Sequence, residues 1–301
     1  MTIQTLADIG EFGFIDRIAA RAHTEEGVIK GVGDDAAVLD CGGKDYLLYT
    51  TDMLIEGVHF LRTIMAPQEI GRKALACSIS DIAAMGGIPT YAVVSTGAPY
   101  NTARSFLEDI GQGFNDLAKE YHVSLVGGDM TRSNRLIINV ALLGKVKKDQ
   151  VIYRAGAKKG DCVFVTGSLG NSFKTRKHAR FTPRVNEAQY LLEHARPNAM
   201  IDVSDGLAGD LGHILEQSGV GAVIRAMDIP LAKDANLDQA LHDGEDFELL
   251  FTVPAQKADA LRRCKKHRFF EIGTICSKPG IFLVDEKGRK RQIEPKGFEH
   301  F

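Results

Sequence analysis

The stretch KALACSISDIAAMGG, residues 73–87, is the part of the sequence from which the fold is inferred first. It continues an apolar pattern that begins at Pro67, and it ends in two glycines with Pro89 just beyond. This arrangement predicts a helix over residues 67–85 that stops at the glycines. Asp81 lies late in this apolar helix, and a buried carboxylate needs a partner. The helix is therefore predicted to reach a functional site.

Strands and helices alternate on both sides of this helix. In the first half, the pattern predicts an amphipathic N-terminal helix, strands at 46–50, 91–96, 124–126 and 136–143, and a long helix at 101–121. In the second half, it predicts strands at 162–167, 222–225 and 248–253 and helices at 186–194 and 207–217. Residues 144–160 are rich in lysine and glycine, so we expect two domains, 1–146 and 147–301. The predicted fold class is α/β (α+β).

The composition is typical of a soluble globular protein. Of 301 residues, 44% are hydrophobic and 25% are charged, and the formal net charge is -2. This charge does not favour general binding of nucleic acid. The sequence shows neither an apolar run long enough to span a membrane nor a signal peptide. The five cysteines lack CxxC spacing, which disfavours zinc sites and a disulfide framework. A cytoplasmic protein without nucleic-acid or membrane partners is predicted.

Five short segments place aspartates after small or hydroxyl residues. They are GVGDDAAV, YTTDMLIEGVHF, CSISDIAAMGG, LVGGDMTR and IDVSDGLAGDL, which contain Asp34, Asp35, Asp52, Asp81, Asp129, Asp202 and Asp205. Magnesium prefers hard oxygen ligands and shares substrate phosphates, so these carboxylates predict one divalent-metal site for a nucleotide phosphate. Asp52, Asp129 and Asp202 follow predicted strands, so turn or helix-cap roles stay open for them. The sequence has no P-loop and no protein-kinase motif set.

Ten motifs, in order, closely resemble those of the thiamine-monophosphate kinase family, part of the aminoimidazole ribonucleotide synthetase superfamily. They are GEFGFIDR, GVGDDAAV, TTDMLIEGVHF, KALACSISDIAAMGG, GGDMTRS, RAGAKKGD, VTGSLGNS, IDVSDGLAGDLGHI, GEDFELLFTV and GFEHF, and they run from about Glu11 to Phe301. The resemblance implies transfer of the ATP γ-phosphoryl group to thiamine monophosphate with Mg2+, giving thiamine diphosphate. It also implies a homodimer, with a barrel-forming N-terminal sheet at the dimer interface and a C-terminal mixed sheet covered by helices.

The same resemblance implies roles for individual residues. The metal ligands would be Asp35, Thr50, Thr51, Asp52, Asp81, Asp129, Asp202 and Asp205, of which Asp52, Asp129 and Asp205 would be catalytic. ATP would contact Gly128, Asp129, Arg154 and Ser204, and thiamine monophosphate would contact His59, Glu245 and Phe298. These residue types suit the roles, because glycine lets backbone approach a phosphate, arginine offers a planar fork and an aromatic face favours a cationic thiazolium.

Simpler roles stay open for several of these residues. His59 could be a packed strand-end residue, Arg154 a solvated surface charge and Phe298 a residue that docks the tail. Two other functions are also considered: phosphoryl transfer to the acceptor of another superfamily member, and binding of a nucleotide or thiamine phosphate without catalysis.

Residues 172–183 depart from the family pattern. The family continues its glycine motif into an alanine-rich helix, whereas NSFKTRKHARFTPR follows at once here, so a helix is expected to be missing. This stretch contains a basic run, and such runs are usually solvated loops, with contact to ATP phosphates as the alternative. The run comprises Lys174, Arg176, Lys177, His178 and Arg180.

Overall fold

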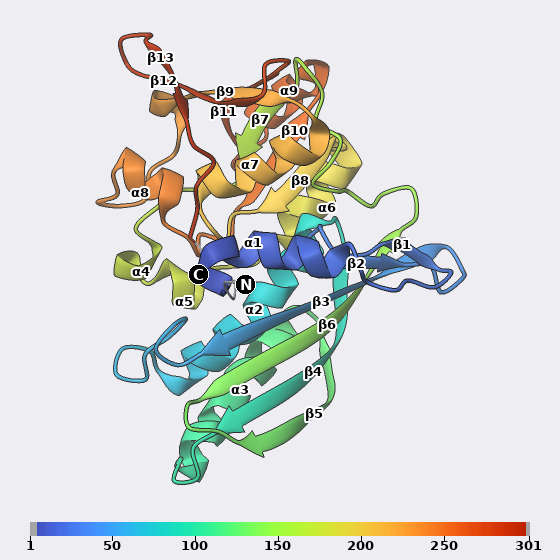
Figure 1. The fold of residues 1–301 in the computed structure, drawn as a ribbon, viewed down its shortest axis with the longest axis vertical. Helices are drawn as coiled ribbons and strands as arrows, with labels where there is room; N and C mark the ends of the chain where they lie inside the picture. Colours follow the sequence, from blue (N-terminus) through green and yellow to red (C-terminus); the bar gives the residue numbers. More distant parts are fainter. Residues whose placement is uncertain (1–4, 299–301) are drawn as a thin grey trace.

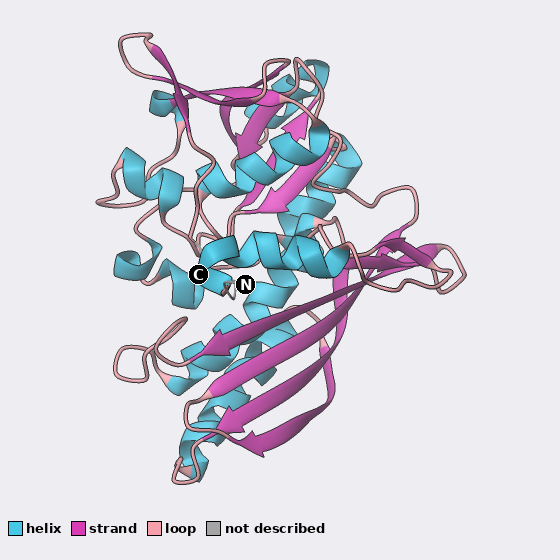
Figure 2. Cartoon of the chain, viewed as in Figure 1, coloured by secondary structure: helices cyan, strands magenta, loops and turns pink. Residues whose placement is uncertain are grey.

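The computed structural model describes residues 5–298, which form two sheets flanked by helices (Figure 1). The predicted mixed α/β class is confirmed, as the distribution of helices and strands shows (Figure 2). The end of the predicted GFEHF motif, residues 299–301, lies outside the described residues. Within residues 5–298, no helix is both long enough and apolar enough to cross a membrane.

The first half builds a six-stranded sheet with the strand order β1-β2-β3-β6-β4-β5. Its neighbours pair antiparallel, except for the parallel pair β4–β5. The strands are β1 (Val28–Lys30), β2 (Ala37–Leu39), β3 (Asp45–Ile55), β4 (Ile88–Ala98), β5 (Ser124–Arg132) and β6 (Ile137–Lys147). The helices of this half are α1 (Leu6–Ala19), α2 (Pro67–Ala84) and α3 (Arg104–Glu120).

Helix α2 confirms the helix predicted over residues 67–85, and α3 begins later than expected. The turn in which the Thr102 amide donates to the Pro99 carbonyl precedes α3, so the helix starts at Arg104 rather than at residue 101. The N-terminal helix is present, with a kink at Gly10, whose φ is 67°. Glycine tolerates this left-handed conformation without a steric penalty.

Strands β3 and β6 are longer than predicted because they pair along eleven residues each. Asp52 therefore lies inside β3, and Asp129 lies inside β5. The alternative that these two aspartates are turn or cap residues is wrong. Asp202 is the last residue of its strand, and its carboxylate accepts a hydrogen bond from Ser80 on α2 rather than capping a turn.

The two faces of the first sheet have different surroundings. One face packs against α2 and α3, whereas the other exposes large apolar side chains: Tyr49, Met53, Tyr91, Val93 and Val126. Within one chain this sheet is open, with β1 and β5 at its edges. The barrel at a dimer interface therefore stays a prediction, as do the domain limits 1–146 and 147–301.

The second half builds a seven-stranded mixed sheet, ordered β13-β12-β9-β11-β7-β10-β8, in which β9 and β12 are parallel. The predicted C-terminal mixed sheet covered by helices is confirmed (Figure 1). Its strands are β7 (Cys162–Val165), β8 (Ala199–Asp202), β9 (Gly221–Arg225), β10 (Leu249–Val253), β11 (Phe270–Cys276), β12 (Gly280–Val284) and β13 (Lys290–Ile293). Its helices are α4 (Ser172–Thr175), α5 (Lys177–Arg180), α6 (Val185–His194), α7 (Leu207–Ser218), η1 (Ala226–Asp228), α8 (Leu237–His242) and α9 (Ala255–Arg262).

The basic stretch that departs from the family pattern forms the short helices α4 and α5 and is not a solvated loop. Arg176 and Arg180 both pair with Glu69 on α2, at 2.5 Å each. Lys177 lies 2.9 Å from the Glu248 carboxylate. The expectation of a solvated loop is wrong because these carboxylates neutralise the basic side chains and draw the segment onto the protein.

Helix α2 is the element that both halves share. It contacts β3, β4 and β6 of the first sheet and β8, α5 and α6 of the second half. Nearly every side chain from Ile70 to Ala84 is buried. The helix also approaches α3 so closely that a Cβ on Gly113 would overlap the carbonyl oxygen of Gln68. A larger residue at this position would force the two helices apart.

We therefore expect Gly113→Ala to lower the free energy of unfolding by about 2 kcal/mol or more, because the overlap is with rigid backbone. Gly111→Ala on the same helix is the matched control, since a Cβ there meets no atom within 4 Å. That control should leave stability unchanged or raise it by up to about 1 kcal/mol, through helix propensity. Urea unfolding of both variants measures the difference, and equal stabilities would contradict the close approach.

Candidate functional site

Buried polar side chains of α2 contact carboxylates from both halves of the molecule. Ser78 Oγ donates to Asp52 on β3 at 2.7 Å, and Ser80 Oγ donates to Asp202 on β8 at 2.5 Å. Asp81 accepts a 2.5 Å hydrogen bond from Thr50 Oγ1. The apolar helix inferred first from the sequence thus places three of the predicted metal ligands next to one another.

Three carboxylates form an acidic cluster, defined as Asp35, Asp81 and Asp202, in which one oxygen of each lies within 4.8 Å of the others. Arg154 pairs with Asp35 through Nη2 at 2.5 Å and Nε at 3.1 Å. The second Asp35 oxygen, Oδ2, is buried and has no hydrogen-bond partner in the described structure. The cluster therefore holds more buried negative charge than its one arginine neutralises.

Burial and mutual repulsion raise the pKa values of these carboxyl groups. Burial, followed by the charge of Asp35, raises the pKa of Asp202 to about 8. Burial also raises the pKa of Asp81 well above its ordinary value, and the Asp52 charge adds to this effect. A divalent cation would relieve the repulsion, and carboxylate oxygens are the ligands that Mg2+ prefers. The donor set and the unpartnered oxygen both fit such an ion.

A cavity of about 610 Å³ borders the acidic cluster and is called here the carboxylate-lined cavity. Its wall contains five carboxylates, those of Glu11, Asp52, Asp205, Asp243 and Glu245. Among its lining residues within the described range 5–298, there is no lysine and no arginine. Its other lining residues are Thr51, Met53, Leu54, Val58, His59, Cys77, Phe173, Ser204, His242, Gly244, Phe247 and Phe298. The cavity is thus both anionic and aromatic.

The three predicted acceptor contacts, His59, Glu245 and Phe298, all line this cavity. Lys73 of α2 is completely buried and joins two of them, because its Nζ lies 2.5 Å from Glu245 Oε1 and 2.8 Å from the His59 carbonyl. The Phe298 amide donates to the Asp205 carbonyl at 2.8 Å, which fixes the described end of the chain against the site. Residues from both halves therefore share one wall.

Not every predicted site residue lies in this region. Gly128 and Asp129 lie on edge strand β5, next to a different hollow. Thr51 lines the carboxylate-lined cavity but lies on the opposite face of β3 from Thr50, and its hydroxyl donates to Asn139 on β6. Arg154 is not a solvated linker charge, because it pairs with Asp35 in the acidic cluster. Roles for these residues in binding stay predictions.

Several residues that shape the site were not singled out from the sequence as site residues. Lys73 and Ser80 are polar residues in an otherwise apolar helical pattern, and that contrast was the available signal. Asp210 is buried on α7 and accepts from the Asp205 amide at 3.1 Å. Phe173 and Glu11 line the cavity from segments far apart in the sequence, so no local pattern could identify them.

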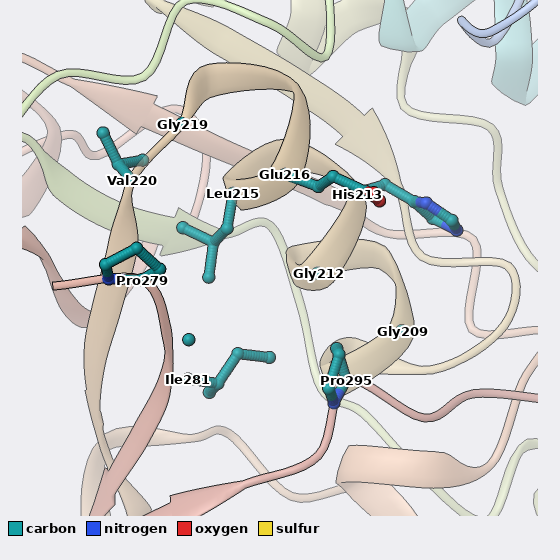
Figure 3. Close-up of a pocket in the computed structure, with 11 residues that line it drawn as sticks. Gly209, Gly212, His213, Leu215, Glu216, Gly219, Val220, Pro279, Ile281 and Pro295 are labelled. Atoms are coloured by element: carbon teal, nitrogen blue, oxygen red, sulfur yellow. The ribbon is translucent and has the colours of Figure 1, made fainter.

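A second hollow, of about 470 Å³, lies between α7 and β12 (Figure 3). Leu215, Val220, Pro279, Ile281 and Pro295 surround it, whereas the His213 ring points away from it. Its lining is mainly apolar and contains one carboxylate, Glu216. This hollow therefore lacks the convergent oxygen ligands that distinguish the carboxylate-lined cavity.

Comparison with known proteins covers nearly the whole chain. Residues 33–146 match the AIR synthase related protein, N-terminal domain, and residues 158–286 match the AIR synthase related protein, C-terminal domain. The thiamine-monophosphate kinase of Aquifex aeolicus (strain VF5) is 33% identical over 325 residues, which cover 98% of this chain and 99% of the relative. That of Bacillus subtilis (strain 168) is 34% identical over 323 residues, which cover 97% and 99%.

Solved structures show the same relationship. The structure of AaThiL complexed with AMPPCP and TMP matches with a TM-score of 0.88 at 32% identity, and the match covers 100% of both chains. At this identity and coverage, the two proteins are similar in both sequence and architecture.

The acidic cluster predicts how stability depends on pH and metal. The Asp202 pKa is about 8 in the folded protein and 3.8 ordinarily, so between these values the folded state binds the extra proton. Stability from this group should therefore fall as pH rises from about 4 to 8. Mg2+ binds ionised carboxylates and should raise the melting temperature more at about pH 8 than at about pH 5.

Thermal unfolding with and without Mg2+ at the two pH values measures this effect. The matched control is Asp202→Asn, which keeps the size of the side chain and removes its titration. That variant should show a weaker dependence of the Mg2+ effect on pH. A Mg2+ effect that is the same at both pH values in the unmodified protein would contradict the prediction.

Proposed function

The chain belongs to the thiamine-monophosphate kinase family of AIR synthase related proteins, and we propose that it transfers the γ-phosphoryl group of ATP directly, in line, to thiamine monophosphate with the help of several Mg2+ ions. One observation carries this proposal: Asp52 lies beside the acidic cluster and also in the wall of the carboxylate-lined cavity. A metal-bound phosphate and an acceptor can therefore meet at this residue. The similar structure of AaThiL holds AMPPCP and TMP together.

The chemistry of the cavity suits the proposed acceptor. Thiamine monophosphate carries a cationic thiazolium and an aminopyrimidine, and a wall of carboxylates and aromatic rings attracts a cationic heteroaromatic. Glu245 is held as a hydrogen-bond acceptor by buried Lys73, and Phe298 leaves 51% of its surface exposed. The acceptor phosphate would lie towards Asp52 and Asp205, where metal ions offset the negative charge.

The proposed metal shell combines the acidic cluster of Asp35, Asp81 and Asp202 with Asp52 and Asp205 of the adjoining cavity wall. Asp35, Asp52, Asp81, Asp202 and Asp205 would hold the ions, and Thr50 orients Asp81 through its hydrogen bond. When bound, Mg2+ neutralises phosphate charge, which is the main requirement of phosphoryl transfer. The chain itself positions the two substrates: Arg154 and Ser204 would contact ATP, and His59 and Glu245 would orient the acceptor.

A homodimer is part of the proposal because Asp129 lies too far from the cluster within one chain. In the strand register, Asp129 of β5 lies beside Ser95 of β4, and Ser95 lies beside Asn139 of β6. Asn139 in turn lies beside Met53 of β3. These three strand spacings amount to about 14 Å. Asp129 also lies on the sheet face that exposes the apolar side chains, so a second copy seated there would bring Gly128 and Asp129 of the partner subunit towards the site.

We also propose that the protein is cytoplasmic. All five cysteines are free thiols, Cys77 and Cys162 being buried. Free thiols throughout a chain are typical of a reducing compartment.

The proposed reaction is tested with purified protein, ATP, Mg2+ and thiamine monophosphate, which should give ADP and thiamine diphosphate in equal amounts. Asp52→Asn should lower kcat about 100-fold or more, because it removes a negative ligand from the junction of the two substrates. Asp116→Asn, at an exposed position on α3, is the matched control and should keep full activity. No product from the unmodified protein would refute the function, and full activity in Asp52→Asn would refute the metal assignment.

The dimer is tested by light scattering after Tyr91→Glu, which places a charge on the apolar sheet face. Burying an unpaired charge is costly, so this variant should be monomeric. A monomer lacks the partner subunit's Asp129, so kinase activity should be lost as well. Met227→Glu changes another exposed apolar residue, in the second half, and should stay dimeric and active. A monomeric unmodified protein that is fully active would contradict the proposal.

A further inference from the structure

Phe173 is an exposed aromatic residue in the wall of the carboxylate-lined cavity, and no role assigned above uses it. Its side chain leaves 58% of its surface exposed, the largest fraction among the phenylalanines of the described residues. Keeping an apolar ring in water costs free energy, which burial elsewhere would recover. A ring retained in this state at a concave site points to contact with a ligand.

The backbone that carries this ring is firmly held. Ser172 is buried, and its Oγ donates to the Glu245 carbonyl at 2.6 Å. Thr175 Oγ1 donates to the Asn171 carbonyl at 2.9 Å, and Arg176 pairs with Glu69 on α2. Phe173 is therefore fixed relative to Glu245, one of the proposed acceptor contacts, and to the helix that shapes the acidic cluster.

One face of the Phe173 ring is already covered. The His178 ring stacks on it, with the ring centroids 4.9 Å apart and the planes 22° from parallel. His178 is itself buried, and its Nδ1 lies 3.1 Å from the Ser172 carbonyl. The stack limits the motion of the Phe173 ring, so little conformational entropy would be lost when a ligand binds to the exposed part.

The surroundings of the ring define the ligand that it would accept. Five carboxylates and a second exposed aromatic ring, that of Phe298, line the same cavity. Aromatic faces and carboxylates together attract a flat cationic group. On the basis of the proposed function, we propose that Phe173 is a specificity-determining contact for a heteroaromatic ring of thiamine monophosphate, in addition to Phe298.

Because the anchoring hydrogen bonds come from Ser172, Thr175 and Arg176, removing the Phe173 ring should leave the fold intact. The effect should instead fall on the acceptor. We expect Phe173→Ala to raise the Kd and the KM for thiamine monophosphate about tenfold, which is typical for loss of one aromatic face beside a cation. The KM for ATP and the melting temperature should change little.

Calorimetric titration with thiamine monophosphate in the presence of Mg2+ gives the Kd, and steady-state kinetics gives the split between KM and kcat. Phe173→Tyr should keep unmodified affinity because it restores an aromatic face. Phe173→Leu, which restores size without a π face, should bind as weakly as the alanine variant. Met227→Ala, at another exposed apolar residue away from the cavity, is the control for removal of surface area.

Two results would overturn the inference while leaving the proposed function standing: an unchanged Kd in Phe173→Ala, or full recovery of affinity in Phe173→Leu. Binding of thiamine monophosphate without turnover in the unmodified protein would refute the proposed kinase function instead. In that case the Kd values of the variants would still decide the role of Phe173. An unmodified protein that fails to bind thiamine monophosphate would refute both.

Discussion

Helix α2 is buried between the two sheets, and the geometry of the site follows from that burial. Lys73, Ser78 and Ser80 lose their contact with water there, and buried polar groups must find partners. The partners are carboxylates on β3, on β8 and on the loop at residues 244–247. The same bonds that permit the helix to be buried therefore orient the site, and they need both halves of the molecule in place.

A consequence of this packing is that negative charge collects where water is scarce. Two carboxylates 4 Å apart repel each other by about 4 kcal/mol at an effective dielectric constant near 20. One arginine, Arg154, offsets part of this repulsion at Asp35. The repulsion that Arg154 does not offset, together with burial, raises the pKa values of Asp81 and Asp202. Binding a proton is one way to remove the negative charge. Binding a divalent cation is the other, and it is the one that a phosphate-handling site can use.

The short segment of α4 and α5 shows how a departure from a family pattern can still serve the site. Its basic side chains pair with Glu69, Asp246 and Glu248, and Arg184 adds a second counter-charge at Glu248. The segment thereby joins α2 to the loop that carries Glu245. It contributes Phe173 to the wall of the carboxylate-lined cavity.

Features with a local signal could be predicted from the residues alone: α2 with its glycine stop, the mixed α/β class and the aspartates that follow small or hydroxyl residues. Features that depend on pairing between distant segments became evident only from the fold. The eleven-residue pairing of β3 with β6 put Asp52 inside a strand, and the strand order put Asp129 at a far edge. Arg154 and Phe173 gained their places through contacts with Asp35 and the cavity wall. Periodicity and capping act over a few residues, whereas strand order and side-chain pairing are fixed by which surfaces are buried together.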